Sequence, residues 1–313
     1  NSINLILLQL TCLRTGIIFC PLNPRFSEHE IAHRLQLVNT QFIWCEQLTS
    51  PLARSSLPLY FSPNQKALMS AKQRPINALQ VVNIIFTSGS SGHPKAVMHS
   101  FSNHFYSALG SQAHIPLRKG DKNLLSLPLF HISGYATVIR TLLAGATLML
   151  SSQKLTSKRL AKQQITHLSL VATQLYRLLE ETEFQQDNLS IKHLLLGGSA
   201  LSEQLLIQTG ARGFTYHLSY GLTEMSSQVA TSSNDSGLQL LKYSELKIIN
   251  NEIFLRGKTR FVGYFNALLA SGEIPEKTWF ASKDLGQKIG PYLHIKGRLD
   301  RQFISGGENV QPE

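Results

Sequence analysis

The chain has 313 residues, of which 42% are hydrophobic and 16% charged, and its formal net charge is +11. This length allows a large core with two or three subdomains, and this composition argues against a disordered chain. The lysines and arginines are scattered and accompany no RNA- or DNA-binding motif, which argues against a nucleic-acid partner. The positive charge indicates instead a general attraction for anionic small molecules.

The cysteines and the apolar start indicate a cytoplasmic protein without a membrane span. Three cysteines form neither a CxxC pair nor an even framework, which suits a reducing compartment. Gln9, Arg14 and Gly16 interrupt the apolar start, so no run reaches the ~18–20 residues that cross a bilayer. We expect a buried helix here, ended by Gly16 and followed by a strand over 17–22.

Helical and strand patterns then alternate along the chain. Ser27 and Glu30 form a capping box that predicts a helix start, and 41–46 reads as a strand. Further strands are expected at 78–87, 123–130, 147–150, 167–172 and 191–198, and helices at 102–115, 137–146, 158–164, 173–182 and 202–212. Such alternation predicts an α/β fold with mostly parallel sheets.

From about residue 238 the pattern changes to short strands with alternating polar residues, at 244–250, 252–257 and 292–297. These predict a small antiparallel, barrel-like β subdomain. We therefore expect an αβ subdomain over 1–126, a second αβ subdomain over 127–236, the β subdomain over 237–296, and a hinge with the start of a further domain over 297–313.

The segment 84–100, IIFTSGSSGHPKAVMHS, has the composition of a phosphate-binding loop. Small residues let backbone N–H groups approach phosphate oxygens, and a lysine adds charge. It is not a Walker loop, because His93 and Pro94 separate Gly92 from Lys95. Taken alone, it leaves a plain turn as an alternative.

The segment 87–97, TSGSSGHPKAV, resembles the phosphate loop of the acyl-adenylate-forming superfamily of acyl-CoA synthetases, luciferases and adenylation domains. Five further segments resemble its motifs in the same order. They are PLFHISG at 128–134 for the acyl pocket, GGSAL at 197–201 beside adenine, YGLTE at 220–224, WFASKDLG at 279–286 for ribose, and GRLD at 297–300 for the hinge. Within the superfamily, SLPLFHISG, TQLYRLL and SGGENVQPE are most similar to the o-succinylbenzoate–CoA ligases of menaquinone (vitamin K2) synthesis.

The resemblance implies a two-step reaction with ATP, Mg²⁺ and coenzyme A. A carboxylate attacks the α-phosphorus of ATP to give an acyl-adenylate and pyrophosphate, and the coenzyme A thiolate then displaces AMP. The residues that would hold the outer phosphates are Thr87, Ser88, Gly89, Ser90, Ser91, Gly92 and Lys95. Those expected at the adenosine and its α-phosphate are Gly198, Ser199, Tyr220, Gly221, Thr223, Asp284 and Arg298.

Three further roles follow from the resemblance. Thr223, Glu224, His131 and Lys95 would be the catalytic group, with Glu224 binding Mg²⁺ and His131 orienting the reacting carboxylate. The residues expected in the acid pocket are His131, Ser133, Gly134, Thr173 and Arg177, and Asp300 would be the hinge. Arg177 would hold the second carboxylate of o-succinylbenzoate, with a helix-surface arginine as the alternative.

Some positions depart from the family pattern. Ser282 and Lys283 replace the usual threonine-glycine before Asp284, and the segment 237–248 lacks the usual Gly-x-Pro. The apolar start without methionine, and the end at Glu313 just past the hinge, lead us to expect a piece of a longer chain, with the C-terminal domain absent. The alternatives are an enzyme of the same superfamily with another acid, or a nucleotide-binding fragment without catalysis. A homo-oligomer stays open.

Overall fold

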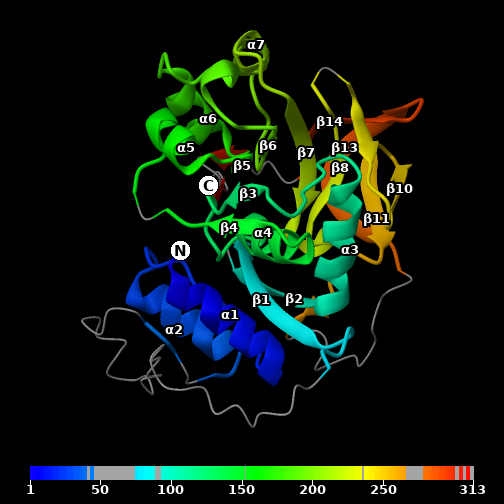
Figure 1. Ribbon diagram of the computed structural model, residues 1–313. Coiled ribbons are helices and arrows are strands. Elements are labelled where there is room, and N and C mark those ends of the chain that lie inside the picture. Colours follow the sequence, from blue (N-terminus) through cyan, green and yellow to red (C-terminus); the bar gives the residue numbers. More distant parts are fainter. Residues whose placement is uncertain are drawn as a thin grey trace.

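The computed structural model describes residues 1–40, 43–45, 75–88, 93–151, 153–234, 236–265, 278–299, 303–305 and 308–310 (Figure 1). The helices are α1 (Ile3–Thr15), α2 (Glu28–Leu37), α3 (Phe101–Gln112), α4 (Ile132–Leu143), α5 (Ser157–Gln163), α6 (Ala172–Leu179) and α7 (Glu203–Ala211), with 3-10 turns η2 (Gln186–Asn188) and η3 (Thr223–Met225). Among these described helices none is long and apolar enough to span a bilayer.

The strands belong to one large and two small sheets. They are β1 (Val81–Ser88), β2 (Pro94–Ser100), β3 (Lys122–Leu124), β4 (Thr147–Met149), β5 (His167–Leu170), β6 (His193–Gly197), β7 (Tyr216–Leu222), β8 (Ser227–Thr231), β9 (Leu238–Leu240), β10 (Ser244–Ile249), β11 (Glu252–Gly257), β12 (Gly263–Tyr264), β13 (Phe280–Ile289), β14 (Tyr292–Arg298), β15 (Phe303–Ser305) and β16 (Glu308–Val310). The small sheets are β1-β2-β12 and β15-β16.

The large sheet has the order β10-β11-β13-β14-β9-β8-β7-β6-β5-β3-β4. Its β4, β3, β5, β6 and β7 are parallel, whereas β8 and the strands beyond it pair antiparallel. The predicted α/β class is confirmed. The expected antiparallel strands continue the large sheet through β9 and β14. The subdomain boundaries at 126, 236 and 296 stay predictions.

Helices separate the small sheet from the large one. In Figure 1, α3 and α4 lie between the β1-β2 hairpin and the large sheet, and both contact β8. The helices α1 and α2 lie beside the hairpin, whereas α5, α6 and α7 lie at the far side of the parallel strands. The hairpin meets the large sheet beyond these helices, where His99 of β2 bonds to the carbonyl of Thr223, directly after β7.

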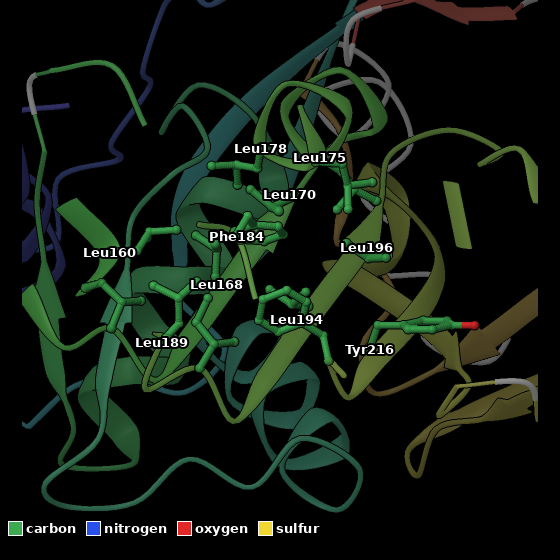
Figure 2. Packing of buried hydrophobic residues seen from close by; sticks show 14 of the residues in the cluster. Leu160, Leu168, Leu170, Leu175, Leu178, Phe184, Leu189, Leu194, Leu196 and Tyr216 are labelled. Atoms are coloured by element: carbon green, nitrogen blue, oxygen red, sulfur yellow. The ribbon is translucent and has the colours of Figure 1, made fainter. Parts of the chain in front are cut away.

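Leucines from the parallel strands and their helices form the largest apolar cluster (Figure 2). Leu168 and Leu170 of β5 and Leu194 and Leu196 of β6 are each at most 1% exposed. Helix α6 adds the side chains Leu175, Leu178 and Leu179 to this cluster. Each such side chain contributes roughly 1.5–3 kcal/mol by burial, so α6 is held firmly by one face while its opposite face stays open.

Two predicted elements near the small sheet were wrong. The strand expected at 17–22 is a single parallel bridge between Phe19 and Asn83, because Pro21 has no N–H to continue the pairing. The segment 94–100, read as part of a loop, is strand β2, since it supplies the antiparallel partner of β1. The expected strand at 41–46 lies mostly outside the described residues.

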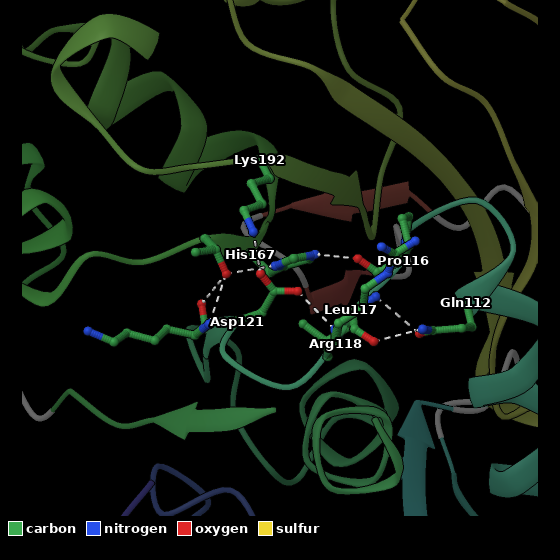
Figure 3. A network of polar contacts seen from close by, with 9 residues as sticks. Gln112, Pro116, Leu117, Arg118, Asp121, His167 and Lys192 are labelled. Carbon is green, nitrogen blue, oxygen red and sulfur yellow. Dashed lines mark hydrogen bonds and ion pairs between the residues drawn. The ribbon is translucent and has the colours of Figure 1, made fainter. Parts of the chain in front are cut away.

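A polar network closes the amino ends of β3 and β5 (Figure 3). The ammonium of Lys192 lies 2.7 Å from Asp121 Oδ1, and the backbone N–H of Arg118 donates to Asp121 Oδ2 at 2.8 Å. Burial works to raise the pKa of Asp121, but these two hydrogen bonds bring it below its ordinary value. His167 Nε2 donates to the carbonyl of Pro116 at 3.0 Å. The network thus fixes the loop before β3.

Three histidines continue this network across the parallel strands. The rings of His167 and His193 lie 5.1 Å apart, and those of His193 and His217 lie 5.0 Å apart. His217 Nδ1 bonds to the carbonyl of Ser232 at 3.1 Å, so it carries the proton, and Nε2 accepts from His193 at 2.8 Å. Burial lowers the pKa of His167 and of His217 to about 4.

The buried histidines make the fold sensitive to acid. Burial also lowers the pKa of His99 to about 4. In the unfolded chain a histidine binds its proton near pH 6.5, so between pH 6.5 and 4 the unfolded state holds more protons and stability falls as pH falls. We expect the free energy of unfolding, measured with urea, to drop between pH 7 and pH 5, approaching about 1.4 kcal/mol per pH unit for each such histidine.

His217→Asn is expected to flatten that pH dependence. An unfolding free energy that is equal at pH 7 and pH 5 would contradict the prediction.

Candidate active site

The phosphate-loop segment lies on the β1-β2 hairpin. Thr87 and Lys95 face each other across the two strands, at the end where the loop connects them. The Lys95 ammonium lies 5.2 Å from the ring centroid of Tyr264 on β12. The hairpin therefore brings Thr87 and Lys95 together, as the phosphate-binding reading requires. Gly89, Ser90, Ser91 and Gly92, and the side chain of Ser88, lie outside the described residues.

The YGLTE motif runs from the end of β7 into the turn η3, and its backbone is fixed from two sides. His99 Nε2 donates to the carbonyl of Thr223 at 2.7 Å, and the N–H of Phe261 donates to the carbonyl of Glu224 at 2.8 Å. His99 is fully buried on β2. The conformation of Thr223 and Glu224 is thus set by the small sheet and by the segment that precedes β12.

The Glu224 carboxylate is held by a tyrosine. The hydroxyl of Tyr264 donates to Glu224 Oε1 at 2.9 Å. Burial raises the pKa of Glu224 above its ordinary value, although this hydrogen bond and the charges of Lys95 and Arg298 oppose the rise. Burial and the neighbouring carboxylate raise the pKa of Tyr264, so its hydroxyl stays protonated and donates.

The predicted adenosine residues meet directly. Tyr220 donates its hydroxyl to Asp284 Oδ2 at 2.7 Å, and Arg298 Nη1 lies 2.8 Å from Asp284 Oδ1. Burial and this carboxylate raise the pKa of Tyr220, which keeps the phenol a donor. At the departure from the family pattern, Ser282-Lys283, Ser282 Oγ accepts a 3.0 Å bond from the N–H of Asp284 and so fixes the backbone beside the carboxylate. Residues from β7, β13 and β14 thus form one cluster.

Two glycines allow close backbone approaches in this region. A Cβ on Gly221 would lie 1.8 Å from the carbonyl oxygen of Ser227, where β8 crosses beside β7. Gly198 has φ of +88° directly after β6, so the chain turns there towards Ser199. Only glycine takes such positions without strain. The GGSAL turn therefore lies at the carboxyl end of β6, beside the carboxyl end of β7.

The predicted acid-binding residues fall into two groups. His131, Ser133 and Gly134 stand at the start of α4, where His131 is the N-cap residue and its ring lies 4.6 Å from that of Phe130. Thr173 and Arg177 are exposed and four residues apart on α6, so they share the open face of that helix.

Gln174 links these two groups. Its Oε1 accepts from the N–H of Val171 at 3.2 Å, and its Nε2 donates to the carbonyl of Ser126 at 3.1 Å. Ser126 stands between β3 and the PLFHISG segment, so one glutamine fixes the start of α6 against the chain that leads to His131. The hinge residue Asp300 lies outside the described residues.

Three residues that fix the site were missed by the sequence analysis: His99, Phe261 and Tyr264. His99 stands in the same segment as the phosphate loop, but its contact is 124 positions away in the chain. Tyr264 stands beside Gly263 in a two-residue strand, too short for a strand pattern. No local pattern could have found these contacts.

Comparison with known proteins decides the family. Residues 1–253 match the family described as AMP-binding enzyme. The chain belongs to this family. Among similar family members, the 2-succinylbenzoate–CoA ligase of Escherichia coli is 34% identical over 316 residues, which are 100% of this chain and 68% of that protein. That of Bacillus subtilis is 28% identical over 96% of this chain and 67% of its own length. The chain thus spans about two thirds of these relatives.

Solved structures of family members agree with the fold. Escherichia coli MenE with bound OSB-AMS matches with a TM-score of 0.83 at 33% identity, over 100% of this chain and 68% of that chain. O-succinylbenzoate coenzyme A synthetase (MenE) from Bacillus subtilis, in complex with ATP and magnesium ion, matches with a TM-score of 0.83 at 27% identity, over 100% and 70%.

Because α4 lies close to the chain before it, we expect substitution by alanine to change stability differently at Gly134 and at Gly210. A Cβ on Gly134 would lie 2.0 Å from the carbonyl oxygen of Pro128, whereas a Cβ on Gly210 in α7 would meet nothing closer than 4.0 Å. We expect Gly134→Ala to lower the free energy of unfolding by about 3 kcal/mol through overpacking. Gly210→Ala, in the last turn of α7, should raise the free energy of unfolding by up to about 0.5–1 kcal/mol, because alanine favours helical backbone over glycine.

Urea denaturation of both variants measures these differences. Equal stability of the two variants would contradict the close packing at Gly134.

Proposed function

We propose that this protein is an acid–CoA ligase that forms AMP, and that its acid is o-succinylbenzoate. One observation carries the proposal: the whole chain aligns with 2-succinylbenzoate–CoA ligases at 34% identity. Related solved structures carry ATP with magnesium ion and the acyl-adenylate intermediate OSB-AMP. Two contacts in the site support the proposal: the cluster of Tyr220, Asp284 and Arg298, and the hydrogen bond from Tyr264 to the Glu224 carboxylate. The reaction yields o-succinylbenzoyl-CoA, the thioester of menaquinone synthesis implied by the sequence resemblance.

The first step joins two anions. An oxygen of the acid's carboxylate attacks the α-phosphorus of ATP, and the bond from that phosphorus to the bridging oxygen breaks, so that pyrophosphate leaves. Lys95, with the loop residues, would hold the outer phosphates, and the hydroxyl of Thr223 would bond to the α-phosphate. Such positioning lowers the barrier by charge neutralisation and by in-line geometry.

A magnesium ion fits beside Glu224. The Glu224 carboxylate offers the hard oxygen ligands that Mg²⁺ prefers. The Tyr264 hydroxyl donates to its Oε1, which leaves other lone pairs of the carboxylate for the ion. Among the described residues no group of three His, Cys, Asp or Glu side chains could hold a metal alone. Phosphate oxygens would therefore supply further ligands, and Mg²⁺ would neutralise their charge.

The other side chains would orient the two substrates. Asp284 would accept hydrogen bonds from the ribose hydroxyls, next to Arg298, with adenine between Tyr220 and the Gly198-Ser199 turn. His131 would orient the reacting carboxylate, and Ser133 and Gly134 would line its pocket. In the second step the coenzyme A thiolate attacks the acyl carbon and the bond to the AMP oxygen breaks. Asp300 would be the pivot between the steps.

Arg177, together with Thr173 on the open face of α6, would hold the second carboxylate of o-succinylbenzoate. A guanidinium binds a carboxylate through paired hydrogen bonds. The cytoplasm is the expected compartment, because the cysteine usage of the chain suits a reducing environment.

Acyl-sulfamoyl adenosine mimics test the named acid. Such a mimic at 100 times its Kd stabilises the folded protein by about 2.7 kcal/mol. We expect the largest rise in Tm with the o-succinylbenzoyl mimic and smaller rises with the benzoyl and acetyl mimics. Arg177→Ala should weaken binding of the o-succinylbenzoyl mimic by roughly 10-fold to 100-fold, as for a lost hydrogen bond to a charged group.

Two controls make the result specific. The benzoyl mimic has no second carboxylate, so Arg177→Ala should leave its binding unchanged. Arg118→Ala removes the same charge from an exposed position before β3, at the amino ends of the parallel strands and away from the start of α6. It should change the affinity for neither mimic. Equal Tm rises with all three mimics would contradict the named acid but keep adenylate formation. No rise with any mimic would contradict the proposed function and favour a fragment without a formed site.

A further inference from the structure

Tyr264 contacts both charged residues that the proposed function places at the nucleotide phosphates. Its hydroxyl donates to Glu224 Oε1 at 2.9 Å, and its ring centroid lies 5.2 Å from the Lys95 ammonium. A cation at that distance is attracted to the face of an aromatic ring. One side chain therefore determines where a carboxylate and an ammonium stand.

The strand register explains how Tyr264 reaches Lys95. Strand β12 pairs antiparallel with β2, and Tyr264 lies opposite Val97. Lys95 precedes Val97 by two residues, so both side chains point to the same face of β2. Tyr264 and Lys95 are thus diagonal neighbours, at a separation that an aromatic side chain spans.

The segment 261–264 anchors the same tyrosine to the YGLTE motif and to β2. The N–H of Phe261 donates to the carbonyl of Glu224 at 2.8 Å, and the N–H of Val262 donates to the carbonyl of Met98 at 2.9 Å. The ring of Phe261 packs edge-on against that of Tyr264, with centroids 5.0 Å apart. The segment 261–264 therefore holds both the backbone carbonyl and the side-chain carboxylate of Glu224.

We propose that Tyr264 is a positioning residue that aligns Glu224 and Lys95 for metal-bound ATP. This inference rests on the proposed function. The hydroxyl keeps the Glu224 carboxylate in one orientation, with acceptor sites left for the cation, and the ring keeps the ammonium of Lys95 on the phosphate side of β2. Preorganised charges cost no rearrangement when the anionic nucleotide binds.

Tyr264→Phe removes the hydroxyl and keeps the ring. We expect it to weaken binding of a non-hydrolysable ATP analogue with Mg²⁺ about tenfold, which corresponds to about 1.4 kcal/mol. Binding of the o-succinylbenzoyl-sulfamoyl adenosine mimic without metal should change less than about twofold, because that ligand has neither outer phosphates nor a need for Mg²⁺. Tyr264→Leu removes the ring as well and should weaken the ATP analogue further. Isothermal titration calorimetry measures all of these affinities.

Tyr106→Phe is the matched control. The Tyr106 hydroxyl accepts from the Lys258 ammonium at 3.2 Å, and that ammonium lies 4.4 Å from its ring centroid, so the same substitution removes a similar bond on α3. It should change neither affinity. A double-mutant cycle adds the direct test: in a Glu224→Ala background, which leaves no carboxylate for the hydroxyl to orient, Tyr264→Phe should have no further effect on binding of the ATP analogue.

Each remaining outcome overturns the inference in a distinct way. If the Tyr264→Phe and Tyr106→Phe variants bind the ATP analogue with Mg²⁺ equally tightly, the positioning role is overturned and the proposed function stays in place. An equal loss for the analogue and for the metal-free mimic would mean that Tyr264 only supports the fold. A parent protein that binds neither ligand overturns both this inference and the proposed function.

Discussion

Two hydrogen bonds to consecutive backbone carbonyls join the two sheets on which the site is built. His99 donates to the carbonyl of Thr223 from β2, and Phe261 donates to that of Glu224 from the segment before β12. Because β12 also pairs with β2, the turn after β7 is enclosed by one continuous set of contacts. A buried carbonyl without a donor would cost about 1–3 kcal/mol, so this junction resists any shift of the phosphate-loop hairpin against the YGLTE turn.

The junction explains why charges from distant parts of the chain can share one site. Lys95 lies on β2 of the small sheet and Glu224 in the turn η3 that follows β7 of the large sheet, and Tyr264 contacts both. Asp284 and Arg298 lie on adjacent strands of the large sheet, where Tyr220 from β7 reaches the same carboxylate. Burial alone would favour the neutral form of such a carboxylate. Donors on each carboxylate, Tyr220 and Arg298 on Asp284 and Tyr264 on Glu224, allow the site to keep negative and positive groups close together before a ligand arrives.

The parallel strands form a rigid base, and their two ends carry different features. Their carboxyl ends carry the GGSAL turn and the YGLTE motif, whereas their amino ends carry the row of three histidines and the Asp121–Lys192 pair. Side chains of α6 that face the leucine cluster hold the helix, and this leaves Thr173 and Arg177 on its open face. Gln174 then fixes that helix relative to the chain before His131. The residues proposed to bind the acid and those proposed to bind the nucleotide thus share one framework.

The sequence by itself determined the α/β class and the helices, and it predicted the motif residues of the site, because hydrophobic periods and contiguous motifs are local. The capping box at Ser27 and the helix end at Gly16 were confirmed for that reason. Strand β2, the single bridge at Phe19, and the contacts of His99 and Tyr264 were decided by tertiary structure alone. Each depends on a partner far away in the chain, and a strand or a buried donor shows its partner only after the sheets have assembled.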